Sequence, residues 1–186
     1  MNIHNYRFRV LLITVIILFV HGKVFADNGI KMHRTQAGER ASSGWYLANS
    51  TNGRFSVLLP LPFNDFSVPG NGKTGVSRIE VVGTKSGEGI KFIANRIFYE
   101  KEKLIKHYFA NFAEGKVFPE ARRRMIKVKN YPAVDIAISN SNSGSMQRAI
   151  MTTDSIILLI VEWPNEYEKT ARALADNFLT SINIDD

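Results

Sequence analysis

The sequence predicts an α/β (α+β) fold in which a mainly antiparallel sheet of about six strands is sandwiched by helices. Most strand-like runs are joined by links of hairpin length, which favours antiparallel neighbours. Two segments carry apolar residues at helical spacing, with charged residues on the opposite side. Residues 156–161 (IILLIV) are apolar on both alternating faces, as expected of a central strand that is covered on both sides. Such a strand requires layers on both faces of the sheet.

The composition excludes several protein classes. The 186 residues are 45% hydrophobic and include no cysteine. These values exclude a disordered chain, a disulfide-stapled miniprotein, a thiol enzyme and a zinc–cysteine site. A protein without disulfides must be held together by its core, and a chain of this length suffices for one domain.

Residues 1–26 have the pattern of a secretory signal peptide. Arg7 and Arg9 precede an apolar run over residues 10–20, and a short polar stretch ends at Ala26. We expect cleavage near Ala26. The alternative is a membrane anchor, but this run is about half of the ~20 residues that a helix needs to cross a bilayer. The mature protein is therefore expected to be soluble and periplasmic or secreted, without a transmembrane segment.

Removal of this leader changes the charge of the protein. The whole chain carries 24 Lys and Arg against 17 Asp and Glu, a net charge of +7. Because three of the basic residues and none of the acidic ones lie in the leader, the mature chain has a net charge of +4. So small a charge gives only a weak argument for binding polyanions, and nucleic acid is not an expected partner of an exported protein.

The mature chain is expected to consist of a flexible leader at residues 27–43 and a single domain at residues 44–186. Small and charged residues without apolar periodicity characterise the leader. The expected strands of the first half of the chain are residues 45–48, 54–59, 75–84 and 90–99. Residues 64–74 include Pro69 and two glycines, so we expect an exposed loop there, of the kind that often binds partners.

The second half is expected to contain two helices and four strands. The first helix covers residues 101–114, with a buried stripe formed by Leu104, Ile105, Tyr108, Phe109, Phe112 and Ala113. The expected strands are residues 125–129, 133–139, 147–152 and 156–163. The last helix follows Pro164, and Asn165 with Glu168 forms its expected capping pair. Its buried stripe is Tyr167, Ala171, Leu174, Ala175, Phe178, Leu179 and Ile182.

Several of these segments together resemble the PsbP superfamily. They are residues 52–60 (NGRFSVLLP), 130–133 (NYPA), 156–161 (IILLIV) and 175–182 (ADNFLTSI). This group shares its helix-covered sheet with the Ran-binding Mog-type factors and with DcrB-like envelope proteins. The resemblance spans residues 44–184 and implies non-enzymatic work such as partner binding. Its motifs mark strand and helix ends, and no binding residue of these families matches one to one.

No cluster of residues predicts catalysis, a metal site or a cofactor. In the expected domain His107 is the single histidine, since His33 falls in the leader, and a partly exposed structural role is expected for it. Ser56, Ser67 and Ser77 lack the glycine-flanked elbow of a hydrolase. Residues 72–74 (GKT) do not form a phosphate loop, because position 67 lacks the required glycine and a strand follows.

One group of basic residues is a candidate partner-binding surface: Arg122, Arg123, Arg124, Lys127 and Lys129. The two lysines alternate with Ile126 and Val128, which on a strand sends the lysines to one face and the aliphatic side chains to the other. A basic ridge of this kind can meet an acidic protein face or an anionic surface. The alternative is that cations on a sheet edge only prevent aggregation.

These observations favour a monomeric exported protein that acts by binding, as a periplasmic adaptor or accessory factor of an envelope assembly. The partner surface would be the basic ridge or the loop at residues 64–74. A second hypothesis is a protein that holds a small lipid or anion between sheet and helix. A third is an enzyme, for which His107 is the best remaining candidate.

Overall fold

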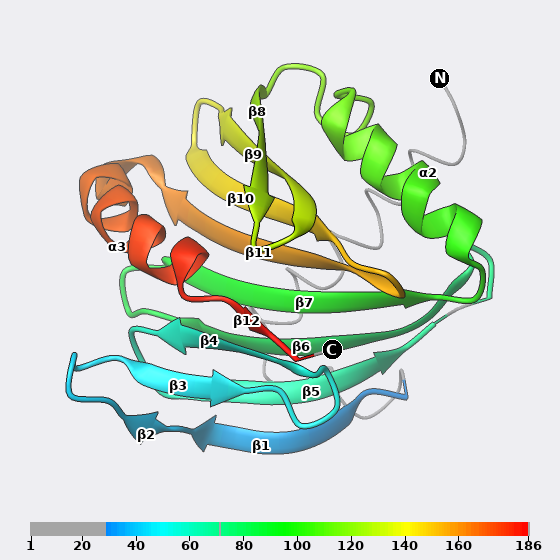
Figure 1. Ribbon diagram of the computed structural model, residues 1–186. Coiled ribbons are helices and arrows are strands. Elements are labelled where there is room, and N and C mark those ends of the chain that lie inside the picture. Colours follow the sequence, from blue (N-terminus) through cyan, green and yellow to red (C-terminus); the bar gives the residue numbers. More distant parts are fainter. Residues whose placement is uncertain (1–28, 71, 186) are drawn as a thin grey trace.

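A curved antiparallel sheet of eight strands forms the centre of the structure, a computed structural model that describes residues 29–70 and 72–185 (Figure 1). The expected signal peptide lies outside these described residues. The order across the sheet is β1-β5-β6-β7-β11-β10-β9-β8. The bounds of these strands are Lys31–Ala37 (β1), Phe63–Pro69 (β5), Val76–Lys85 (β6), Lys91–Tyr99 (β7), Ser155–Pro164 (β11), Ser143–Met151 (β10), Tyr131–Ser139 (β9) and Arg122–Val128 (β8).

One face of this large sheet is covered by helix α2 and the other by helix α3 together with a second, smaller sheet (Figure 1). Helix α2 spans Glu102–Ala113, and α3 spans Glu168–Thr180 after a 3-10 turn, η1, at Asn165–Tyr167. The second sheet has the order β12-β4-β3-β2. Its bounds are Asn183–Ile184 (β12), Phe55–Leu59 (β4), Tyr46–Asn49 (β3) and Glu39–Arg40 (β2).

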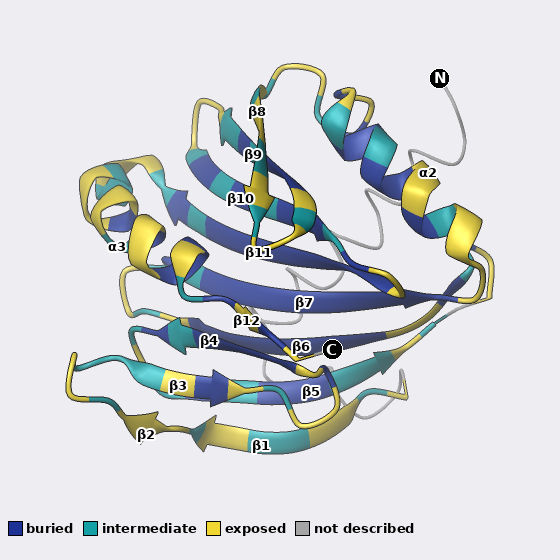
Figure 2. Cartoon of the chain, in the orientation of Figure 1, coloured by how far each residue is buried: buried dark blue, intermediate teal, exposed yellow. Residues whose placement is uncertain are grey.

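Two hydrophobic clusters, one on each face of the large sheet, form the core. On β11, Ile156, Leu158 and Ile160 pack on the α2 side, whereas Ile157, Leu159 and Val161 pack on the α3 side. Strands β7 and β11 are accordingly among the most buried segments of the chain (Figure 2). The doubly covered central strand predicted at residues 156–161 is confirmed.

The number of strands differs from the sequence prediction. The large sheet has eight strands rather than about six, and four more lie in the second sheet. Part of the difference comes from the expected leader at residues 27–43, where β1 pairs with β5 and β2 pairs with β3. Residues 31–37 and 39–40 of the expected flexible segment therefore form strands, and His33 and Arg34 of β1 contact Ser67 and Asp65 of β5.

The expected loop at residues 64–74 also differs. Its first half forms β5, in which Asp65 and Phe66 are buried. The sequence suggested a loop because Asn64, Asp65, Ser67 and Pro69 are typical of turns. Burial of Asp65 is possible because other segments supply donors to its carboxylate.

The predicted helices are confirmed, with a different start to α3. The expected capping pair of Asn165 and Glu168 does not form, because η1 precedes the helix and Tyr167 occupies its N-cap position without a side-chain cap. Asn165 instead donates its amide to the carbonyl oxygen of Asn140 at 3.0 Å. In the described ranges, neither helix has the length and apolar character that crossing a membrane requires.

Candidate functional site

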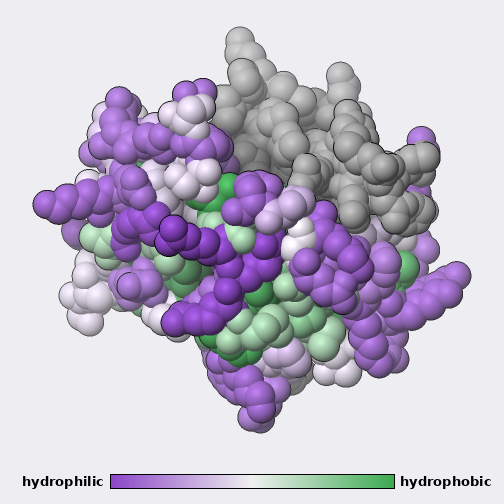
Figure 3. Space-filling model, turned by 90° about the horizontal axis from the view of Figure 1, so that it is seen from above, coloured by the Kyte–Doolittle hydropathy of each residue, from purple (hydrophilic) through white to green (hydrophobic). Residues whose placement is uncertain are grey.

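Strand β8 carries the basic residues that the sequence singled out. It lies at one end of the large sheet, and within the described part of the chain no strand pairs with its outer edge. Arg122, Arg124 and Lys127 are exposed on it, together with Met125, which is 57% exposed. Figure 3 shows this end of the sheet from above, where hydrophilic side chains surround a smaller apolar area.

The basic residues do not form a ridge on one face. Ile126 and Val128 pack against the core on the α3 side, as the alternation predicted. By the same alternation Arg122 and Arg124 share that face, whereas Lys127 points to the opposite one. The single-faced ridge expected from the sequence is therefore replaced by an edge with cations on both faces.

Two of the five basic residues, Arg123 and Lys129, donate to groups outside the large sheet or to the backbone. Arg123 donates its Nε to the carbonyl oxygen of Phe112 at 3.2 Å and its Nη1 to that of Ala121 at 2.6 Å, which satisfies a carbonyl at the end of α2. Lys129 follows β8 in a left-handed conformation with a φ of 52°, and its Nζ donates to Oδ1 of Asn183 at 2.8 Å. These contacts leave Arg122, Arg124 and Lys127 as the basic group of the edge.

Arg124 forms part of a small charge network. Its Nη2 lies 3.1 Å from Oδ2 of Asp135, whose carboxylate also receives Nε and Nη2 of Arg148 at 2.7 and 3.1 Å. Arg148 is mostly buried, whereas the side chain of Arg124 is 77% exposed. Two guanidinium groups thus share one carboxylate, so the edge keeps a positive charge.

A second polar group, which the sequence did not predict, lies between the large sheet and the turn at residues 49–54. We call Arg54, Arg78, Arg96, Phe98 and Asp154 the arginine–Phe98 cluster. The guanidinium carbon of Arg78 lies 3.9 Å from the centre of the Phe98 ring, and those of Arg96 and Arg54 lie at 5.3 and 6.0 Å. Three cations therefore gather around one aromatic ring, an arrangement that cation–π attraction favours.

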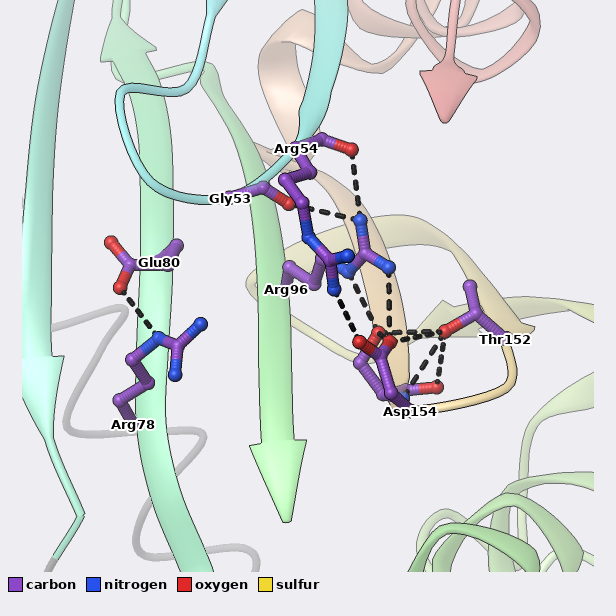
Figure 4. Close-up of polar contacts among 8 residues, drawn as sticks. Gly53, Arg54, Arg78, Glu80, Arg96, Thr152 and Asp154 are labelled. Atoms are coloured by element: carbon purple, nitrogen blue, oxygen red, sulfur yellow. Dashed lines mark hydrogen bonds and ion pairs between the residues drawn. The ribbon is translucent and has the colours of Figure 1, made fainter. Parts of the chain in front are cut away.

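Arg96 is the buried centre of this cluster. Its Nη1 donates to the carbonyl oxygens of Gly53 at 3.0 Å and Arg54 at 2.8 Å, and its Nη2 donates to Oδ1 of Asp154 at 3.0 Å (Figure 4). Its Nε donates to Oγ of Ser155 at 2.7 Å. Arg54 also forms an ion pair with Asp154. Arg96 thus fixes the turn at residues 49–54 onto strand β7.

Asp154 titrates under two opposing influences. Partial burial tends to raise the pKa of its carboxyl group, but hydrogen bonds from Ser155 and Arg96, with the charge of Arg96 and a hydrogen bond from Arg54, outweigh this effect. The pKa of Asp154 is therefore lowered from its ordinary value of 3.8. The carboxylate stays charged at neutral pH and holds both arginines.

Arg78 is oriented by a buried carboxylate. Its Nε donates to Oε1 of Glu80 at 3.1 Å, and the side chain of Glu80 is 2% exposed. Glu80 also accepts the hydroxyl proton of Ser67, whose Oγ lies 2.6 Å from Nε2 of His33. His33 therefore belongs to the folded part of the chain, which corrects its expected place in a flexible leader.

The contact of His33 with Ser67 does not form a hydrolase triad. In a triad the histidine accepts the serine proton, whereas here that proton goes to Glu80. His107, the other histidine of residues 29–185, is exposed on α2, and its Nε2 lies 3.3 Å from the amide nitrogen of Asn111. In the ranges that the structure describes, no three His, Asp or Glu side chains are grouped as metal ligands.

One sequence signal could have revealed the arginine–Phe98 cluster. Arg96 interrupts the otherwise apolar and neutral strand-like run of residues 92–99 (FIANRIFY). A buried strand tolerates a guanidinium only where several acceptors surround it. Which acceptors these are could not be read from the sequence, because Gly53 and Asp154 lie 43 and 58 residues away.

No protein-family model and no curated protein sequence matches this chain. Its matches among solved structures include the solution structure of cyanobacterial PsbP (CyanoP) from Synechocystis sp. PCC 6803. The identity is 10%, the match covers 81% of this chain and 98% of that one, and the TM-score is 0.45. PsbP is the group that the sequence resembles.

A second match is the crystal structure of LpqN, a protein involved in cell envelope biogenesis of Mycobacterium tuberculosis. The identity is 12%, the match covers 89% of this chain and 96% of that one, and the TM-score is 0.38. No residue role is transferred from either structure.

Proposed function

We propose that this chain is a non-enzymatic exported binding protein, an adaptor or accessory factor of a cell-envelope assembly, and that strand β8 binds an acidic segment of its partner. The observation that supports this proposal most directly is the outer edge of β8, seven residues long, with which no strand of the described residues pairs and on which Arg122, Arg124 and Lys127 are exposed. The signal-like sequence at residues 1–26 supports export.

The chemistry of an open edge suits an extended partner. A terminal strand presents backbone N–H and C=O groups that a further strand can pair with, and side chains on both faces then add specificity. On β8 these side chains are cations, so an incoming strand with Asp or Glu at several positions gains electrostatic attraction. Binding of this kind weakens as salt is added, because exposed charges are screened.

The alternative role of the same cations is protection. Charged side chains on an edge strand hinder pairing with other chains, and such protection needs no partner. The two roles differ in one measurable respect. A guarded edge contacts no specific protein in its native setting, whereas a binding edge contacts one through β8.

A photo-reactive amino acid at Met125 provides the first test, because this side chain is 57% exposed in the middle of β8. The protein is expressed in its source, irradiated, and examined for a reproducible cross-linked partner. The purified partner is then titrated against the unsubstituted protein at low and high salt. We expect an acidic segment at the cross-link and weaker binding at high salt.

The second test compares two charge-reversed proteins. Arg122→Glu with Lys127→Glu removes the cations of the edge, and Lys85→Glu with Lys169→Glu makes the same change in net charge at exposed positions elsewhere. We expect the first pair to raise Kd about tenfold or more and the second to have little effect. An equal loss of affinity in both proteins would show that binding depends on net charge alone. An unchanged affinity in the first protein would exclude the edge of β8 as the binding site.

An open pocket beside helix α2 favours a second candidate function, the binding of a small anionic ligand. Its volume is about 540 Å³, and it lies where α2 meets the segment before β6. The lining includes Lys73, Lys103 and His107 beside the apolar side chain of Leu104. Native mass spectrometry of the protein purified from its source tests this function, with a retained ligand mass that is lost on Lys103→Glu as the expected result.

A further inference from the structure

Two guanidinium groups of the arginine–Phe98 cluster, those of Arg54 and Arg78, are only partly used by contacts among the described residues, and Arg78 alone leaves both terminal nitrogens without such a contact. Arg96 donates through Nε, Nη1 and Nη2 to groups of the chain, and Arg54 donates through Nη2 to Asp154. Arg78 uses only Nε, toward Glu80. In Figure 4 no dashed line joins the two terminal nitrogens of Arg78 to the other residues drawn.

Arg78 is also held in place on two sides. Its guanidinium carbon lies 3.9 Å from the centre of the Phe98 ring, and Glu80, which accepts its Nε, is almost completely buried. The side chain of Arg78 is nevertheless 47% exposed. Its two terminal nitrogens therefore form a fixed, accessible pair of donors, and this geometry matches two oxygens of a carboxylate or a phosphate.

The charges of the cluster favour an anion at this point. Arg54, Arg78 and Arg96 contribute three positive charges, against the two negative charges of Glu80 and Asp154. All three guanidinium groups approach the same ring, so they also repel one another. A bound anion offsets this excess positive charge.

We propose that the arginine–Phe98 cluster is a binding site for an oxyanion group, a phosphate or a carboxylate, which the terminal nitrogens of Arg78 hold as a pair of donors. Arg54 adds positive charge beside the same ring. This site is separate from the edge of β8, since β7 and β8 stand at different places in the large sheet with β11, β10 and β9 between them.

The test uses inorganic phosphate and acetate as probes, with sodium chloride at matched ionic strength as the reference salt. Thermal unfolding and the side-chain Nε–H signal of Arg78 in NMR spectra are followed as each anion is added. We expect a saturable change with one or both anions beyond the effect of chloride. An anion at tenfold excess over its Kd is expected to raise Tm by about 3–6 °C in a domain of this size.

The variant Arg78→Gln removes the donors, and Arg172→Gln is its matched control. Arg172 likewise lies over an aromatic ring, at 5.4 Å from the centre of Trp163, and pairs through Nε with a carboxylate, that of Glu168, at 2.7 Å. Its side chain is 46% exposed. Arg78→Lys keeps the charge without the paired donors, so it should keep only part of the response.

Loss of the anion response in Arg78→Gln, with retention in Arg172→Gln, would establish the site, and the responding anion would identify its chemistry. A protein that responds to neither anion more than to chloride would overturn the proposal, as would an unchanged response in Arg78→Gln. The protein with Arg122→Glu and Lys127→Glu should keep the anion response, because three strands separate β8 from β7 in the large sheet. The outcome of this test is therefore independent of the proposal for β8.

Discussion

Arg96 shows how one buried charge can fix a surface turn. The residue is 2% exposed, and its guanidinium group donates to two backbone carbonyl oxygens of the turn at residues 49–54. It also donates to Asp154 on the β10–β11 turn and to Ser155, the first residue of β11. One side chain on β7 thus joins two turns that are far apart in sequence, and removing it leaves buried acceptors unpaired.

We therefore expect Arg96→Gln to be strongly destabilising. Its loss leaves the buried carbonyl oxygen of Gly53 and the buried hydroxyl of Ser155 without their donor, at a cost of about 1–3 kcal/mol for each buried group, whereas the carboxylate of Asp154, which is 45% exposed, regains water. Chemical denaturation measures the change through the midpoint at an unchanged slope. Arg172→Gln, at a half-exposed ion pair, should change the free energy of unfolding by about 0.5 kcal/mol or less. A similarly small change in Arg96→Gln would contradict this account.

Asp154 makes the stability of the cluster dependent on pH. Burial raises the pKa of its carboxyl group, but the hydrogen bonds from Ser155, Arg96 and Arg54 together with the charge of Arg96 outweigh burial and lower the pKa from 3.8. A carboxyl group whose pKa is lower in the folded state stabilises the fold above its unfolded pKa. That contribution is lost as the pH falls through the folded pKa. The loss therefore begins near pH 4 and continues in more acidic solution.

The variant Asp154→Asn isolates this effect. At neutral pH it should be less stable than the unsubstituted protein, because Arg54 and Arg96 lose their carboxylate. As the pH falls below about 4, the difference in unfolding free energy between the two proteins should shrink, since Asp154 becomes protonated in the reference protein. Denaturation curves at a series of pH values measure this difference. A difference that stays constant down to strongly acidic pH would show that Asp154 does not titrate as described.

At the level of elements, β1 depends on one buried carboxylate. Oδ2 of Asp65 on β5 accepts Nε and Nη2 of Arg34 at 3.0 and 2.8 Å. The same oxygen accepts the backbone N–H and the hydroxyl of Thr51 at 3.0 and 2.5 Å. Asp65 is fully buried, so it connects β1, β5 and the turn at residues 49–54 through a single oxygen.

Asp65→Ala should therefore loosen β1 before the rest of the sheet. Hydrogen exchange followed by mass spectrometry should show slow exchange of the amides of Lys31–Ala37 in the unsubstituted protein and faster exchange in the variant. The amides of β10 and β11 should keep their protection, because Asp65 contacts neither strand. Asp176→Ala, at an exposed position of α3, is the control. Rapid exchange of residues 31–37 in the unsubstituted protein would contradict the assignment of β1 as a stable strand.

Elements whose pattern is apolar could be predicted from the sequence, whereas those that rest on distant polar contacts could not. The run at residues 156–161 and the helical stripes of α2 and α3 are local signals, and all three are confirmed. The sequence of β1 resembles a flexible leader, because Asp65, the partner of Arg34, is separated from it by 31 positions in the chain. The basic residues of β8 were found by their charge. The sequence could not show that these residues divide between two faces, or that Arg123 contacts the end of α2. Both features depend on where β8 begins.

At the level of the whole molecule, the large sheet joins the α2 layer and the α3 layer into one unit. Neighbouring residues of β11 and of β7 belong to different hydrophobic clusters, so neither layer can lose its packing without exposing the same strands. Phe112 lies in the cluster beneath α2 and Phe178 in the cluster beneath α3, and both are fully buried. They are equivalent probes of the two layers.

We expect Phe112→Ala and Phe178→Ala each to lower the free energy of unfolding by about 3–5 kcal/mol, through lost burial and the cavity left behind. Because the two layers share their strands, unfolding should remain a single transition in both variants. Tryptophan fluorescence reports on the α3 side, because both Trp163 and Trp45 pack there, and amide exchange of Glu102–Ala113 reports on α2. The two probes should give the same midpoint in denaturant. If Phe112→Ala released α2 while Trp163 stayed packed, the layers would be independent units and the large sheet would not couple them.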